Sequence, residues 1–140
     1  MTGTAPPFVK KPEGTCYLVI CRDGPGAATL RAQHLDGHLE HVELHWTRYI
    51  TAGPFREPGG ETFVGSLFLV MGTTLDEVKS LMDGDPYIRC GMYASVEYKE
   101  FTNSIGQFIG GKIWESREAI RHRAAGGPPH DISKGYKIST

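Results

Sequence analysis

The chain has 140 residues, of which 39% are hydrophobic and 22% are charged. This length and composition fit one compact domain and exclude an intrinsically disordered chain or a low-complexity fibre. The 15 lysine and arginine residues are balanced by 16 aspartate and glutamate residues, so no basic surplus predicts a nucleic-acid partner. The three cysteines form no CxxC pair, and no apolar run approaches the roughly 20 residues of a membrane span. These features favour a cytoplasmic protein with no membrane partner.

The N-terminal half contains a polar segment, an apolar run and a helical pattern. We expect residues 1–14 to form an N-terminal arm. The apolar run Cys16–Cys21 lies between glycine-containing turns and predicts a buried strand. Residues 27–47 predict one long helix, because their apolar members recur at helical spacing and indicate a single buried face. The members of this apolar stripe are Leu35, Leu39, Val42 and Trp46.

The next elements are bounded by turn and capping signals. Gly53 and Pro54 end a short strand that directly follows the long helix. Thr74 and Glu77 form a capping-box pattern, which predicts the start of a second helix after Thr74. The remaining predicted strands cover residues 48–52, 62–71 and 92–101, and the second helix covers residues 75–83.

The predicted order is strand, helix, strand, strand, helix, strand, which is the ferredoxin-like βαββαβ arrangement of an α+β protein. This arrangement packs both helices on one face of an antiparallel sheet and leaves the other apolar face without a cover. A second copy of the chain is the simplest cover, so we expect a homodimer or a higher homo-oligomer. We expect this domain to span residues 15–101. Residues 102–140 predict a C-terminal extension with a short strand or hairpin around residues 105–114, a short helix around residues 116–125 and a tail.

Four of the six histidines lie on one narrow stripe of the predicted long helix. One interpretation is a polar flank of surface histidines. A second is a metal site, because histidines four residues apart on a helix can chelate a divalent ion, although no HExxH pattern is present. A third is general acid/base catalysis, because histidine exchanges protons near neutral pH. The four candidates are His34, His38, His41 and His45.

Asp85 is the candidate for a carboxylate that orients such a histidine. It follows Gly84, which ends the second predicted helix, and it precedes Pro86, which restricts the local backbone. Tyr87 then places a phenol beside this acid at the predicted entry to the fourth strand. A plain turn aspartate is the alternative interpretation. Because both helices share one face of the predicted sheet, contact between the long helix and this turn is geometrically possible.

Four short segments have the order and spacing of a known family: Tyr17–Ile20, His38-Leu39, Ala52-Gly53-Pro54 and Asp85-Pro86-Tyr87. Their combination resembles the YciI-like (YCII-related) family of the dimeric α+β barrel superfamily. The resemblance implies a homodimer of ferredoxin-like protomers and a cleft that holds a histidine–aspartate pair. It implies that the pair consists of His38 and Asp85 and that no cofactor is needed. Better-defined members resemble small dehydrochlorinases or related lyases that act on ring-derived aromatic compounds.

On these grounds we expect His38 to act as general base or acid, with Asp85 holding its tautomer. Tyr87 would donate a hydrogen bond to a developing oxyanion. Arg31 would bind a substrate carboxylate through its guanidinium fork, and Arg22 is a weaker candidate for the same role. The predicted substrate-binding residues are Arg31, His34, Arg22, Gly53 and Pro54.

The expected function is acid/base chemistry on a small ring-derived metabolite, such as elimination, dehydrochlorination, tautomerisation or lactone chemistry, without a metal or other cofactor. Two alternatives remain open from the sequence. One is a non-catalytic dimeric module that binds a small ligand. The other is a metal-dependent enzyme that uses the histidine stripe. The three further histidines and the C-terminal extension depart from the family pattern, so the resemblance does not identify the substrate.

Overall fold

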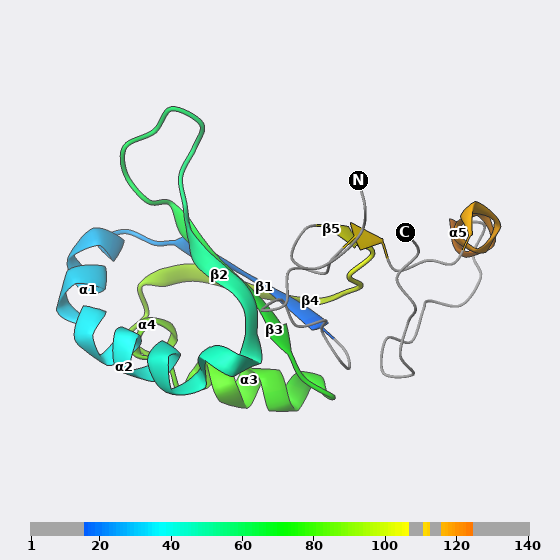
Figure 1. The fold of residues 1–140 in the computed structure, drawn as a ribbon. Helices are drawn as coiled ribbons and strands as arrows, with labels where there is room; N and C mark the ends of the chain where they lie inside the picture. The colour runs from blue at the N-terminus through cyan, green and yellow to red at the C-terminus, as the bar shows by residue number, and fades with distance from the viewer. Residues whose placement is uncertain (1–15, 107–110, 113–115, 125–140) are drawn as a thin grey trace. The chain divides into compact units, whose positions relative to one another are not determined.

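The computed structural model describes residues 16–106, 111–112 and 116–124 (Figure 1). The predicted N-terminal arm and the predicted tail lie outside these residues. Residues Tyr17–Glu100 form one compact unit, and the other described residues belong to a second unit. The strands of the main sheet are β1 (Cys16–Asp23), β2 (Tyr49–Phe55), β3 (Gly65–Met71) and β4 (Tyr93–Phe101). The helices of the compact unit are α1 (Ala27–Gln33), α2 (Leu35–His45), the 3-10 turn η1 (Trp46–Arg48), α3 (Leu75–Asp83) and α4 (Pro86–Arg89).

The four long strands form one antiparallel sheet in the order β2-β3-β1-β4. The chain crosses over through α1 and α2 between β1 and β2, and through α3 and α4 between β3 and β4. Figure 1 shows α2 and α3 beside the same face of the sheet. This topology confirms the predicted ferredoxin-like βαββαβ fold.

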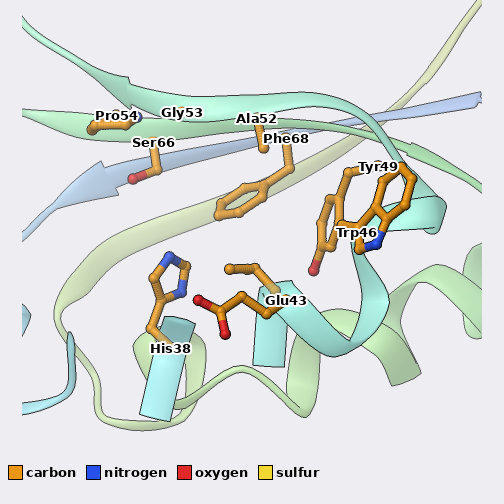
Figure 2. Close-up of a pocket in the computed structure, with 10 residues that line it drawn as sticks. His38, Glu43, Trp46, Tyr49, Ala52, Gly53, Pro54, Ser66 and Phe68 are labelled. Atoms are coloured by element: carbon orange, nitrogen blue, oxygen red, sulfur yellow. The ribbon is translucent and has the colours of Figure 1, made fainter. Parts of the chain in front are cut away.

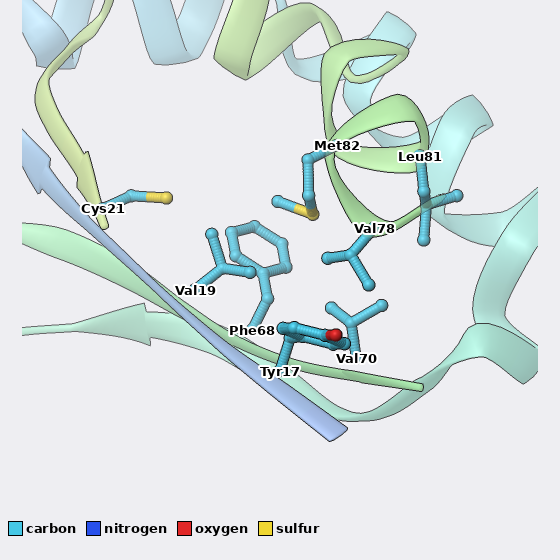
Figure 3. Close-up of a cluster of buried hydrophobic side chains, with 8 residues drawn as sticks. All are labelled: Tyr17, Val19, Cys21, Phe68, Val70, Val78, Leu81 and Met82. Atoms are coloured by element: carbon cyan, nitrogen blue, oxygen red, sulfur yellow. The ribbon is translucent and has the colours of Figure 1, made fainter. Parts of the chain in front are cut away.

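The hydrophobic core lies between this face of the sheet and α3. Figure 3 shows the side chains of α3 directed toward alternate side chains of β1 and β3, as strand geometry requires. The predicted limits of α3 are confirmed, and the Thr74 hydroxyl accepts a hydrogen bond from the Glu77 amide at 3.2 Å. Each fully buried aliphatic side chain contributes about 1.5–3 kcal/mol to folding. The cluster consists of Tyr17, Val19, Cys21, Phe68, Val70, Val78, Leu81 and Met82.

The prediction of one continuous helix over residues 27–47 is wrong in two respects. The helix is interrupted at His34, whose φ of −105° and ψ of 11° separate α1 from α2. The predicted apolar stripe is also not buried, because Leu35, Leu39 and Trp46 are 43%, 40% and 69% exposed. Val42 is half-buried.

The histidine-bearing face of α2 is the one that turns toward the rest of the fold, because two glycines allow a close approach there. A Cβ atom on Gly37 would lie 3.0 Å from the Pro86 ring, and one on Gly84 would lie 2.9 Å from the His41 ring. These contacts bring α2 onto α4 and onto the end of α3. The half-buried positions of α2 are therefore Gly37, His38, His41, Val42 and His45.

Strand β2 extends beyond its predicted end and includes Gly53 and Pro54. β2 is an edge strand, and proline is tolerated at an edge because no neighbour needs its missing N–H. Pro54 lies opposite Ser66 of β3, and Ala52 lies opposite Phe68. Through this longer pairing, residues 52–54 lie opposite residues 66–68 of β3.

In the second unit, β5 (Ile105–Gly106) pairs antiparallel with β6 (Gly111–Lys112), and α5 spans Arg117–Ala124. These elements fall within the ranges predicted for a hairpin and a short helix. The buried Asn103 amide donates a hydrogen bond to the Cys16 sulfur at 2.9 Å. None of the helices in the described ranges is long and apolar enough to cross a membrane.

Candidate active site

His38 of α2 and Asp85, which lies between α3 and α4, are in direct contact although 47 positions separate them in the sequence. The His38 Nδ1 atom is 2.9 Å from both carboxylate oxygens of Asp85. The His38 side chain is 16% exposed, whereas the Asp85 side chain is fully buried. A carboxylate accepts hydrogen bonds only, so the neutral imidazole carries its proton on Nδ1 and leaves the Nε2 lone pair free.

The position of Asp85 is fixed by its own local structure. Asp85 is the N-cap of α4, and its Oδ1 atom accepts a hydrogen bond from the Tyr87 amide at 2.9 Å. Pro86 occupies the first turn of this helix, where the missing proline N–H has no cost. Helix α4 was not predicted from the sequence, but its N-cap and its proline are the signal that could have revealed it. The buried carboxylate thus has hydrogen bonds from the backbone and from an imidazole.

Tyr87 supports the His38 ring by stacking. The two ring centroids are 3.8 Å apart with an interplanar angle of 7°. The Tyr87 hydroxyl donates a hydrogen bond to the Arg31 carbonyl oxygen at 3.1 Å. Burial raises the pKa of Tyr87, so the phenol stays protonated and keeps this bond at neutral pH. The phenol is therefore engaged with the protein, and the face of the ring is what contacts His38.

A cavity of about 620 Å³ lies between α2 and the strands β2 and β3, and His38 forms part of its wall. Figure 2 shows the His38 ring directed across this cavity toward β2 and β3. The cavity walls are mostly apolar, with a few polar side chains among them, which is typical of small-molecule sites. The lining residues are His38, Val42, Glu43, Trp46, Tyr49, Ala52, Gly53, Pro54, Ser66 and Phe68.

Only some of the predicted substrate-binding residues lie at the cavity. Gly53 and Pro54 line the cavity. The Arg31 guanidinium is bound by both carboxylate oxygens of Asp23, at 2.7 and 2.9 Å, so its fork is already occupied. His34 lies between α1 and α2 and is not among the lining residues. Arg22 is exposed on β1, where strand alternation directs it away from the core face.

Most residues of the cavity wall were not predicted from the sequence. Glu43, Tyr49 and Ser66 supply polar atoms to it, and Trp46 and Phe68 supply aromatic surface. Ala52 lies opposite Phe68 because β2 pairs with β3. The register of this hairpin could have indicated that contact from the sequence. Which α2 residues line the cavity depends on which face of the helix turns inward. The apolar stripe was predicted to be that face, and this prediction was wrong.

No group of three or more described histidine, cysteine, aspartate and glutamate side chains has the arrangement of a metal site. Three histidines of the stripe contact other protein groups. His38 binds Asp85, and the His41 and His45 rings lie 4.8 Å apart at an angle of 53°.

His41 is expected to make folding stability depend on pH. Burial lowers the pKa of His41; the nearby His45 and His38 lower it further, while Asp85 and the Leu81 backbone oppose this effect. The unfolded chain then binds more protons than the folded chain just below the ordinary histidine pKa of about 6.5. Stability from this group is present above that pH and is lost as the pH falls toward the folded-state pKa.

We therefore expect the midpoint of thermal unfolding to be lower at about pH 5.5 than at about pH 7.5, and His41→Gln to reduce this difference. Circular dichroism melts at the two pH values measure it. His122→Gln on α5 is the matched control, because His122 is exposed. An equal pH dependence in wild type and His41→Gln would contradict the assignment to His41.

The fold agrees with comparisons to known proteins. The chain matches the family model of the YCII-related domain over residues 15–102. It therefore belongs to the YCII-related family, which confirms the resemblance found in the sequence.

One sequence relative and one solved structure illustrate the similarity. An uncharacterized protein of Haemophilus influenzae is 30% identical over 94 residues, which cover 61% of this chain and 94% of the relative. The solved structure of 5-chloro-2-hydroxyhydroquinone dehydrochlorinase (TftG) from Burkholderia phenoliruptrix AC1100, in complex with 2,5-dihydroxybenzoquinone, superposes with a TM-score of 0.59. That similarity covers 64% of this chain and 95% of TftG at 24% identity, and it supports the fold.

Proposed function

We propose that this protein is a small enzyme that uses His38 and Asp85 for acid/base chemistry on a ring-derived organic molecule. The observation that carries the proposal is the placement of the imidazole. Its Nδ1 atom is bound by a fully buried carboxylate, and the ring also forms part of the wall of the 620 Å³ cavity. A base oriented by a second residue and facing a mostly apolar pocket is the arrangement that proton transfer to or from a bound molecule needs.

The proposed reaction needs no redox partner. His38 Nε2 takes a proton from a ring atom beside a carbonyl, and the electron pair of the broken bond forms a new double bond. In an elimination, a leaving group such as chloride departs from the adjacent carbon with its own electron pair, and the imidazolium later loses its proton to water. In a tautomerisation, the imidazolium returns the proton to a different atom. Asp85 stabilises the imidazolium in either case.

The similarity to TftG supports a ring compound as the substrate class. TftG is a dehydrochlorinase of a chlorinated hydroxyhydroquinone and its structure holds a dihydroxybenzoquinone. The cavity of the present protein has aromatic walls from Trp46 and Phe68, which suit a planar ring. Gly53 and Pro54 form the part of the wall contributed by β2, where the small glycine leaves room for a ligand.

A substrate screen tests this proposal. Hydroxylated and halogenated aromatic compounds, their quinones and their lactones are incubated with the wild-type protein, and absorbance changes and chloride release are followed. We expect at least one compound to be consumed. Binding of compounds without any turnover would contradict the enzyme and favour a ligand-binding module instead.

We also propose that the protein is a homodimer. On the sheet face opposite the helices, Leu18, Ile20 and Leu67 alternate with the core residues and are only half-buried in the single chain. An apolar sheet face of this kind is stabilised by packing on a second sheet. Sedimentation at micromolar concentration is expected to give twice the 15.4 kDa of one chain, or a multiple. A monomer would contradict this assembly.

A further inference from the structure

The geometry points to Tyr49 as the residue that binds an oxygen atom of the substrate, and so to a ring compound that carries a carbonyl, hydroxyl or carboxylate oxygen. This inference rests on the proposed function, because it assigns a second contact within the same cavity. Tyr49 is the first residue of β2, follows the turn η1, and lines the cavity that His38 also lines.

One feature of Tyr49 that indicates this role is its unsatisfied hydroxyl. The Tyr49 oxygen is buried, and it has no hydrogen-bond partner within the part of the chain that the structure describes. Buried polar groups in folded proteins nearly always have a partner, because an unpaired donor loses its hydrogen bonds to water and gains none in return. Figure 2 shows this hydroxyl directed into the cavity. A group that enters the cavity is thus placed to supply the missing partner.

The Tyr49 hydroxyl is also held in place and acts as a donor. The Tyr49 ring packs against Phe68, with centroids 5.9 Å apart, and belongs to the rim of the core cluster. Burial raises the pKa of Tyr49 to about 12, so the phenol remains protonated across the physiological range. A protonated phenol donates to an oxygen lone pair and pairs well with a carbonyl or an oxyanion.

Ser66 is a second hydroxyl of the cavity wall, but unlike Tyr49 it is not left without a partner. The Ser66 side chain also lines the cavity, but its oxygen already accepts a hydrogen bond from the Tyr93 hydroxyl at 2.9 Å. Figure 2 places Ser66 and Tyr49 on opposite sides of Phe68, with His38 on the side of Ser66. A ring that lies against Phe68 would therefore present one edge to His38 and another edge to Tyr49.

The main alternative is a bound water molecule that satisfies the Tyr49 hydroxyl and has no part in recognition. Tyr49→Phe distinguishes the two, since it removes the hydroxyl and keeps the ring that packs on Phe68. The probes are 2,5-dihydroxybenzoquinone, which carries ring oxygens, and 1,4-dimethylbenzene, which has none. Tyr98→Phe on β4 is the matched control, because Tyr98 is half-buried and lies outside the cavity lining.

We expect Tyr49→Phe to bind 2,5-dihydroxybenzoquinone about 10-fold more weakly than wild type, and to bind 1,4-dimethylbenzene equally well. Tyr98→Phe should bind both probes as wild type does. Isothermal titration gives the affinities, and thermal unfolding shows whether the variants stay folded. A structural role for Tyr49 would weaken binding of both probes to the same extent.

Equal affinity of wild type and Tyr49→Phe for the quinone would overturn the assignment of Tyr49 and indicate a water site. Failure of wild type to bind the quinone would overturn it as well. The proposed function is judged by a different readout, the turnover of the compound panel. Weaker quinone binding by Tyr49→Phe without any turnover would support the contact and contradict the enzyme. Turnover of a compound by wild type, together with unchanged quinone binding by Tyr49→Phe, would support the enzyme and contradict the contact.

Discussion

His38→Gln is expected to lower the turnover of a substrate found in the screen by about 10²- to 10⁴-fold, which is the usual contribution of a general acid or base. Glutamine can still donate an amide hydrogen to Asp85, so the buried carboxylate keeps a partner. Glutamine cannot accept and release a proton near neutral pH. The loss should therefore appear in kcat more than in KM, because the cavity wall changes little.

The control for this substitution is His45→Gln. His45 lies on the same stripe of α2, but it contacts His41 and is not among the cavity residues. Its turnover should stay within about twofold of wild type, since substitutions away from such contacts have small effects. Steady-state kinetics on both variants gives the comparison. If His45→Gln loses turnover and His38→Gln keeps it, the assignment of the base to His38 is wrong.

The fold was predictable because its signals are local. The segment around Thr74 has a capping residue, an apolar stripe and a terminating glycine, and α3 has the predicted limits. The apolar runs of β1 and β3 are continuous enough to indicate strands whatever their neighbours are. Once two strand–helix–strand units are recognised, few arrangements remain for an antiparallel sheet.

The orientation of α2 was not predictable in the same way. Leu39 and Trp46 form an apolar stripe that normally indicates the buried face, yet both are exposed. The face that packs is selected by Gly37 and Gly84, where the missing side chains permit close contact with Pro86 and His41. Such a contact depends on two segments far apart in the sequence, and no periodicity within one helix reports it.

The candidate site was predictable only in part for the same reason. His38 and Asp85 were selected by the histidine stripe, the turn at Pro86 and the family resemblance, and the structure brings them into contact. Arg31 was selected by its charge, but Asp23 occupies its guanidinium. Tyr49 has no distinguishing motif, because its importance depends on a buried hydroxyl that lacks a described partner.

Asp85→Asn is expected to lower turnover by about 10³- to 10⁴-fold while leaving the fold intact, as the loss of a tautomer-holding carboxylate does in other histidine-dependent enzymes. The asparagine carbonyl can still accept the hydrogen bond from the Tyr87 amide, so the N-cap of α4 is preserved. Its amide group, however, can donate a hydrogen to His38 Nδ1. The imidazole would then carry its proton on Nε2, which faces the cavity, and would present no lone pair to the substrate.

The tautomer can be measured apart from the activity. The ¹⁵N chemical shifts of the His38 ring should report Nδ1–H in wild type and a larger share of Nε2–H in Asp85→Asn. Asp83→Asn is the matched control, because Asp83 is exposed at the end of α3 and should leave both readouts unchanged. Asp85→Ala is expected to differ from Asp85→Asn in stability, because it removes the N-cap at a cost of about 0.5–2 kcal/mol. Full turnover by a folded Asp85→Asn protein would show that the carboxylate does not orient a catalytic base.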